Sequence, residues 1–131
     1  MDLYSKLKDM KLLLIDDDSW IRGSLSLFFE GEGCHIRALE TAEEGIEELK
    51  VQKYDFIIVD YKLPGMDGLE FLRRIRDAHP YAGKIFITAY GSKEVVSRAK
   101  ELGVHEFIQK PFTSEAIESS LARLIDKSPN A

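Results

Sequence analysis

The sequence predicts a single α/β domain in which helices cover both faces of a parallel β-sheet. Short apolar runs of strand length alternate along the chain with amphipathic segments of helical period. The length of 131 residues suits one domain of the commonest size. Strands that alternate with helices form right-handed βαβ units, and such units place the strands parallel to one another.

Five segments are expected to be strands. Four of them are short apolar runs, and the fifth alternates apolar and polar side chains, which is typical of a strand that is buried on one face. In chain order the predicted strands are Leu12–Ile15, His35–Leu39, Phe56–Val59, Lys84–Ile87 and Phe107–Gln109.

Five helices are expected, one after each strand. Each shows apolar residues at intervals of three or four, so that one stripe of the helix faces the sheet. The residues that carry these stripes are Ile21, Leu25 and Phe28; Ile46 and Leu49; Leu69, Leu72 and Ile75; Val95, Ala99 and Leu102; and Ile117, Leu121 and Leu124.

Several helix ends are marked by their residue types. Thr41 with Glu44, and Asp67 with Glu70, have the spacing of capping boxes. Gly103 suits the end of a helix, where a left-handed backbone conformation is needed. These signals agree with the boundaries that the apolar periodicity indicates.

Composition and charge exclude several classes of function. A formal net charge of −5, with acids and bases interleaved, leaves no basic stripe, so we expect no direct nucleic-acid binding by this domain. No run approaches the roughly 18 apolar residues of a membrane span, and the first residues lack a secretory signal. Cys34 is the single cysteine, which agrees with a reducing compartment. We therefore expect a cytoplasmic protein.

Polar side chains follow four of the five predicted strands. Asp16 and Asp17 follow the first strand, and Asp60, Thr88 and Lys110 follow the third, fourth and fifth. Because the carboxyl ends of parallel strands share one edge of a sheet, we expect these residues to meet in one pocket. The pocket would hold three carboxylates, a hydroxyl and an ammonium.

This set of groups suits magnesium and phosphoryl chemistry. Mg²⁺ binds one or two protein carboxylates together with waters and phosphate oxygens. A carboxylate can also attack a phosphoryl donor to give an acyl phosphate, and Asp60 is best placed for this because it stands alone on the middle strand. Lys110 and Thr88 would then hold phosphate oxygens. Asp18 and Ser19 are expected instead to begin the first helix, where an acid caps exposed amides.

Four stretches of the sequence together resemble the receiver domain of bacterial two-component response regulators, including the chemotaxis regulators. They are "LLLIDDDS", "DFIIVDYKLPGMDGLEFL", "IFITAY" and "FIQKPF", in this order. The resemblance implies a flavodoxin-like, doubly wound (βα)5 fold with strand order 2-1-3-4-5. It places the receiver domain at residues 11–126, after an N-terminal extension of residues 1–10 and before a tail or linker stub of residues 127–131.

The resemblance also implies roles for individual residues. Asp60 matches the aspartate that accepts a phosphoryl group from a histidine kinase in a reaction that needs Mg²⁺ or Mn²⁺. Asp17 matches the direct metal ligand, Asp16 its partner through water, and the backbone carbonyl of Lys62 a further ligand. Lys62 and Tyr90 are expected to shield the acyl phosphate from water.

The remaining matches concern the switch and its output. Thr88 and Lys110 match the residues that hold the phosphoryl oxygens, and the Lys110-Pro111 bond matches one that is usually cis. Phe107 matches an aromatic side chain that turns inward as Thr88 moves. The signalling face would comprise the fourth and fifth of the predicted helices and the strand between them, including Lys93, Glu94, Glu106 and the exposed side of residues 115–123.

The resemblance implies partners as well. They are a sensor histidine kinase or phosphotransfer protein, and either a downstream protein or an output domain in a longer chain; a phosphorylation-dependent homodimer is also compatible. Such a domain modifies itself and turns over no external substrate, so we do not expect an enzyme. Two alternatives stay open: a receiver-like interaction domain that is not phosphorylated, and an aspartate-nucleophile phosphatase of the haloacid-dehalogenase class. The second lacks support because Lys62 occupies the place of its general acid.

Overall fold

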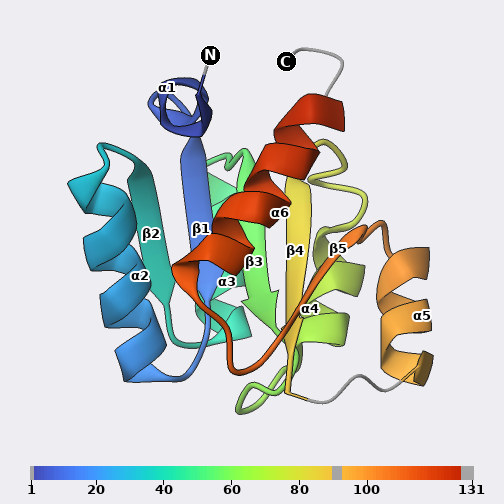
Figure 1. The fold of residues 1–131 in the computed structure, drawn as a ribbon. Helices are drawn as coiled ribbons and strands as arrows, with labels where there is room; N and C mark the ends of the chain where they lie inside the picture. The colour runs from blue at the N-terminus through green and yellow to red at the C-terminus, as the bar shows by residue number, and fades with distance from the viewer. Residues whose placement is uncertain (1, 90–92, 128–131) are drawn as a thin grey trace.

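Five parallel strands form one sheet, in the order β2-β1-β3-β4-β5 (Figure 1). The structure is a computed structural model that describes residues 2–89 and 93–127. The strands are β1 (Lys11–Ile15), β2 (His35–Leu39), β3 (Phe56–Asp60), β4 (Gly83–Thr88) and β5 (Glu106–Gln109). The helices are α1 (Leu3–Leu7), α2 (Ser19–Gly31), α3 (Ala42–Val51), α4 (Gly68–Ile75), α5 (Lys93–Glu101) and α6 (Ser114–Lys127).

The helices divide into two layers, one on each face of the sheet (Figure 1). Successive strand residues point to opposite faces. Leu12 and Leu14 of β1 therefore join a core with α1, α2 and α6, whereas Leu13 and Ile15 join a second core with α3, α4 and α5. The three central strands are buried on both faces, which explains why each contains a continuous apolar run of three or four residues.

The predicted strands and helices are present, and the strand order is the one that the resemblance implied. Asp60 and Thr88 are the last residues of their strands instead of the first residues after them. The short helix α1, inside the expected N-terminal extension, was not predicted. Lys127, the first residue of the expected tail, is the last residue of α6, and residues 128–131 lie outside the described part of the chain.

The predicted helix ends are correct with one exception. Thr41 and Glu44 form the complete capping box of α3, and Gly103 has a φ of 94° after α5. Asp67 caps α4 by accepting from the Glu70 N–H at 2.9 Å. However, the Glu70 carboxylate binds Arg73 and Arg74 one turn further along and does not reach back to the cap, so the second capping box was wrong.

Two further findings concern the surface. Glu106, expected to be part of the signalling face, is buried, and it forms an ion pair with Arg123 of α6 at 2.8 Å. The sequence did not indicate this partner, which lies 17 residues away on another element.

Over the described residues, no helix combines the length and the apolar character that a membrane crossing requires.

Candidate functional site

The carboxyl ends of β1, β3, β4 and β5 bring the predicted polar residues to one edge of the sheet. Asp16 follows β1, Asp60 ends β3, Thr88 ends β4 and Lys110 follows β5. The register places Asp60 beside Ile87 of β4, and Thr88 beside Gln109 of β5. The parallel sheet thus assembles the predicted cluster from residues as far apart as Asp16 and Lys110.

Three carboxylates form the acidic part of the site. Asp16, Asp17 and Asp60 each offer a carboxylate oxygen, and these oxygens all lie within 4.8 Å of one another. Asp16 and Asp60 are buried, whereas Asp17 is exposed and opens the cluster to solvent. Hard oxygen ligands in this arrangement fit a divalent cation such as Mg²⁺, which retains several of its waters.

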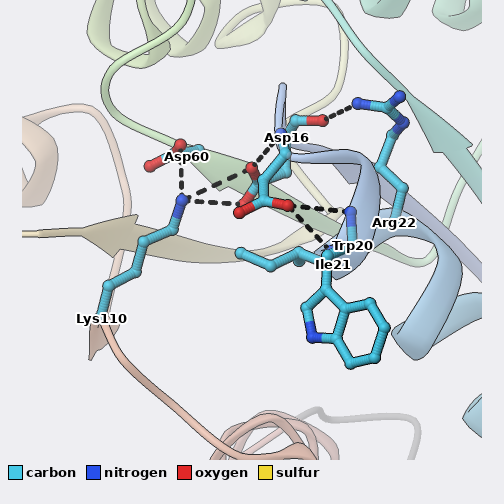
Figure 2. Close-up of polar contacts among 7 residues, drawn as sticks. Asp16, Trp20, Ile21, Arg22, Asp60 and Lys110 are labelled. Atoms are coloured by element: carbon cyan, nitrogen blue, oxygen red, sulfur yellow. Dashed lines mark hydrogen bonds and ion pairs between the residues drawn. The ribbon is translucent and has the colours of Figure 1, made fainter.

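Lys110 lies between two of these carboxylates (Figure 2). Its Nζ is 3.0 Å from Asp60 Oδ2 and 3.2 Å from Asp16 Oδ2. The Lys110 ammonium therefore forms ion pairs with two buried carboxylates at once. The negative charge of the cluster exceeds its positive charge. This excess is what a bound cation would balance.

The backbone and side chain of Asp16 are held from several sides (Figure 2). Its Oδ1 accepts a hydrogen bond from the Asp18 N–H at 2.9 Å, and its backbone carbonyl accepts one from Arg22 Nη1 at 2.9 Å. Asp16 Oδ2 is buried and, apart from its ion pair with Lys110, has no hydrogen-bond partner among the described residues. A buried oxygen in this condition fits a water of a hydrated cation.

The charges of the cluster shift its protonation equilibria. Burial raises the pKa of Asp60 to about 6, with a further contribution from the charge of Asp16, against the opposing hydrogen bond from Lys110. Burial also raises the pKa of Asp16. For Lys110, burial alone would lower the pKa, but the hydrogen bond to Asp60 and the two acidic charges outweigh it and leave the pKa raised. Lys110 is therefore a stable positive charge.

Thr88 and Lys110 are joined through their backbones. The Thr88 carbonyl accepts from the Lys110 N–H at 2.9 Å, and the Thr88 side chain is buried at the end of β4. The Lys110-Pro111 peptide bond is cis in the structure, as the resemblance implied.

The loop after β3 begins beside the acidic cluster. Lys62, two residues after Asp60, is exposed in this loop. The loop ends where α4 begins, and a Cβ at Gly68 would lie 2.4 Å from the Asp60 carbonyl oxygen, so only glycine permits this close approach. Tyr90, the other residue expected to shield the site, lies outside the described residues.

Phe107 lies on β5, close to two other side chains. Its ring packs edge-on against Phe86 at 6.2 Å, and Lys100 Nζ of α5 lies 6.0 Å from its centre. The ring is half-buried, at the boundary between the second core and the α5 surface. This is the position that a side chain moving between surface and interior would occupy.

Sequence reasoning missed two parts of the site. The first is Arg22, whose contact with the Asp16 carbonyl is signalled only by a basic residue one turn into the following helix. The second is a hollow of about 850 Å³ beside Lys110, between α2 and the segment after β5. Trp20, 78% exposed, and Phe28 lie on its α2 side, and Pro111 and Phe112 lie on the other. Asp18 caps α2 as expected, accepting from the Trp20 and Ile21 amides.

Comparisons with known proteins agree with this geometry. The sequence model of the response regulator receiver domain matches residues 12–122. Sporulation initiation phosphotransferase F of Bacillus subtilis (strain 168) is 29% identical over 120 residues, which cover 92% of this chain and 97% of that protein. Transcriptional regulatory protein GlrR of Escherichia coli (strain K12) is 31% identical over 124 residues, 95% of this chain but only 28% of that protein.

A solved structure shows the same fold. The receiver domain protein, described as CheY-like, from Methanospirillum hungatei JF-1 superposes with a TM-score of 0.81 and is 28% identical. The match covers 91% of this chain and 98% of that chain.

Proposed function

The chain belongs to the family of response regulator receiver domains, and from this premise we propose that Asp60 accepts a phosphoryl group in a reaction that depends on a divalent cation. The observation that supports this most directly is the contact of Lys110 with Asp60 inside a cluster of three carboxylates. An acidic cluster alone would bind a cation, but an added lysine also neutralises a phosphoryl oxygen.

The cation that we propose is Mg²⁺, with Mn²⁺ as a substitute. Asp17 and Asp60 would bind it directly, Asp16 through a water, and the backbone carbonyl of Lys62 would complete the contribution of the protein. When bound, the cation supplies positive charge to the phosphoryl oxygens. Asp16 Oδ2 is buried and is contacted by the Lys110 ammonium without a hydrogen bond, which supports its role as an acceptor for a metal-bound water.

The donor is a phosphohistidine of a sensor kinase or phosphotransfer protein. An oxygen of the ionised Asp60 attacks the phosphorus atom, the phosphorus–nitrogen bond breaks, and the imidazole leaves with the electron pair of that bond. Lys110 and the Thr88 hydroxyl then hold phosphoryl oxygens. Because the modified group belongs to the protein itself, and no external substrate is turned over, the domain is a switch and not an enzyme in the usual sense.

Phosphorylation would then alter the face formed by α5, β5 and α6. The new negative charge draws Thr88 toward Asp60, and Phe107 moves into the space that is vacated. A downstream protein, an output domain of a longer chain or a second copy of the domain would bind this face in its altered form. The kinase would approach at the hollow beside Lys110, between α2 and the segment after β5. All these partners would meet the domain in the cytoplasm, away from membrane and nucleic acid.

The experiment that tests the proposal is intact-mass measurement after incubation with Mg²⁺ and acetyl phosphate. We expect the gain of one acid-labile phosphoryl group, its loss in excess chelator, and its loss in Asp60→Asn. Asp77→Asn, an exposed acid between α4 and β4, is the matched control and should still be labelled. Absence of labelling in a folded parent chain would contradict the proposal and favour a receiver-like domain that only binds partners.

A further inference from the structure

The loop between β3 and α4 is closed at its base by backbone hydrogen bonds. The Tyr61 N–H donates to the Ile87 carbonyl at 2.8 Å, and the Gly68 N–H donates to the Tyr61 carbonyl at 2.8 Å. These bonds fix the two ends of the loop against β4 and α4. They leave the tip, Pro64-Gly65-Met66, without a backbone bond to the sheet among those in the described residues.

The tip is held instead by a side chain from α3. Glu43 Oε2 accepts a hydrogen bond from the Met66 N–H at 3.0 Å, although the two residues are 23 positions apart. The same carboxylate oxygen lies close to the neighbouring residue as well, since a Cβ at Gly65 would be 2.5 Å from Glu43 Oε2. Gly65 also has a φ of 74°, a conformation that favours glycine.

The other glutamates of α3 are engaged elsewhere. Glu44 completes the capping box with Thr41, and Glu47 pairs with Lys50. Glu48 accepts a hydrogen bond from the Tyr54 hydroxyl at 2.5 Å. Within residues 2–89 and 93–127, Glu43 is therefore the glutamate of α3 that reaches the loop after Asp60. The hydrogen bond from Met66 also lowers the pKa of Glu43, so the carboxylate stays ionised as an acceptor.

We propose that Glu43 is a positioning residue for the metal site, acting through the loop that it anchors. Lys62 lies between the fixed base at Tyr61 and the tip at Met66, so the position of its backbone carbonyl depends on both attachments. With the tip anchored, the carbonyl is presented to the cation in one arrangement. Without the anchor, the loop spends part of its time in arrangements that do not bind metal. The apparent affinity for the cation then falls in proportion to the fraction of molecules whose loop is in the binding arrangement.

This inference rests on the proposed function, and a simpler role for Glu43 competes with it. A negative charge in the first turn of a helix stabilises that helix through its dipole. Glutamine separates the two roles, because it keeps an oxygen that accepts from Met66 but loses the charge. Glu43→Gln should therefore preserve loop anchoring, and Glu43→Ala should abolish it.

The experiment compares Glu43→Ala, Glu43→Gln and the parent chain, with Glu47→Ala as a matched control on the same helix. The first readout is amide hydrogen exchange at Met66 without metal. The second is the dissociation constant for Mg²⁺ from calorimetric titration. In Glu43→Ala we expect faster exchange at Met66 and Mg²⁺ binding weaker by about threefold to tenfold, the size of one ordinary exposed hydrogen bond. Glu43→Gln and Glu47→Ala should stay within about twofold of the parent chain.

Three results would overturn the inference. Unchanged exchange at Met66 in Glu43→Ala would show that the side chain does not anchor the loop. Equal losses in Glu43→Ala and Glu43→Gln would assign the effect to the helix dipole. Faster exchange with unchanged Mg²⁺ affinity would remove the link to the metal. A parent chain that binds no Mg²⁺ would instead overturn the proposed function, and the metal-positioning role with it.

Discussion

At the scale of single residues, the site is defined by an imbalance of charge around Asp60. Asp16 and Asp60 are buried within reach of one ammonium, and Asp17 adds a third acid at the surface. Lys110 cannot neutralise all three. The protein therefore carries electrostatic repulsion that a cation would relieve, which is a cost to folding in its absence.

Burial of Asp60, together with this repulsion, destabilises its charged form, and stability measurements can detect the effect. The folded-state pKa of Asp60, about 6, lies above its ordinary value of 3.8, so between these pH values the folded protein binds more protons than the unfolded chain. Stability therefore falls as pH rises through this window. Asp60→Asn removes the effect, and we expect the variant to be more stable than the parent by about 1–2 kcal/mol at pH 7.

The measurement is urea unfolding in chelator at several pH values. The difference between Asp60→Asn and the parent should shrink as pH falls and approach zero near about pH 3, below both pKa values, where the parent carboxyl is mostly protonated in both states. Asp77→Asn, an exposed acid far from Lys110, should show no such trend. A stability difference that does not change with pH would mean that neither burial nor the neighbouring acids destabilise the charged form of Asp60.

Individual site residues differ in how far the sequence predicts them. Asp16, Asp60, Thr88 and Lys110 were predictable because each lies at the carboxyl end of a parallel strand, and those ends must meet. The contact of Glu43 with Met66 was not predictable, because it depends on the path of a loop 23 residues away. The burial of Glu106 was also not predictable, because its partner Arg123 lies on another element.

At the scale of elements, two helical glycines have opposite environments. Gly45 of α3 faces the sheet, and a Cβ there would lie 2.4 Å from Ile15 Cδ1 and 2.9 Å from Phe71 Cε1. Gly23 of α2 is exposed, and a Cβ there would meet nothing within 4 Å. Alanine favours a helix over glycine at both positions, so packing decides the net effect.

We expect the same substitution to change stability in opposite directions. Gly45→Ala overpacks the junction of α3, β1 and α4 and should destabilise the domain by about 1–3 kcal/mol. Gly23→Ala should stabilise it by about 0.5–1 kcal/mol. Thermal or urea unfolding of the two variants measures both effects. A stabilising Gly45→Ala would show that the Ile15 and Phe71 side chains move aside at little energetic cost. It would also show that α3 does not pack as closely as the distances indicate.

The elements themselves were largely predictable, because each strand and each long helix carries its own periodicity. The exceptions have local physical causes. Helix α1 spans only Leu3–Leu7, too short for an apolar stripe to repeat. The capping box at Asp67 failed because Arg73 and Arg74 compete for the Glu70 carboxylate. Spacing alone does not reveal such a competitor.

At the scale of the whole molecule, α1 joins two helices of one layer. Tyr4 donates a hydrogen bond to Glu118 of α6 at 2.5 Å, and its ring packs edge-on against Phe28 of α2. Leu7 is completely buried in the core of that layer. The family match begins at residue 12, so α1, which makes these contacts with α2 and α6, lies outside it. The cooperative unit therefore includes residues before the family match.

Leu7→Ala tests this conclusion. We expect a loss of about 2–4 kcal/mol in the free energy of unfolding, because a fully buried leucine leaves a cavity in the core. Tyr4→Phe, which removes only the hydroxyl, should cost about 1 kcal/mol. Urea unfolding followed by circular dichroism measures both. If Leu7→Ala lost no more stability than Tyr4→Phe, α1 would be an appendage and not part of the core.

Helix α6 also has a mechanical consequence, because it runs diagonally across the sheet (Figure 1). It begins at Ser114, four residues after Lys110, and its 14 residues make a rod roughly 21 Å long. A tilt of about 10° at its first turn would therefore carry its last turn through roughly 4 Å. A small reorientation of the first turn of α6, close to Lys110, would therefore displace the far end of the helix by a larger distance.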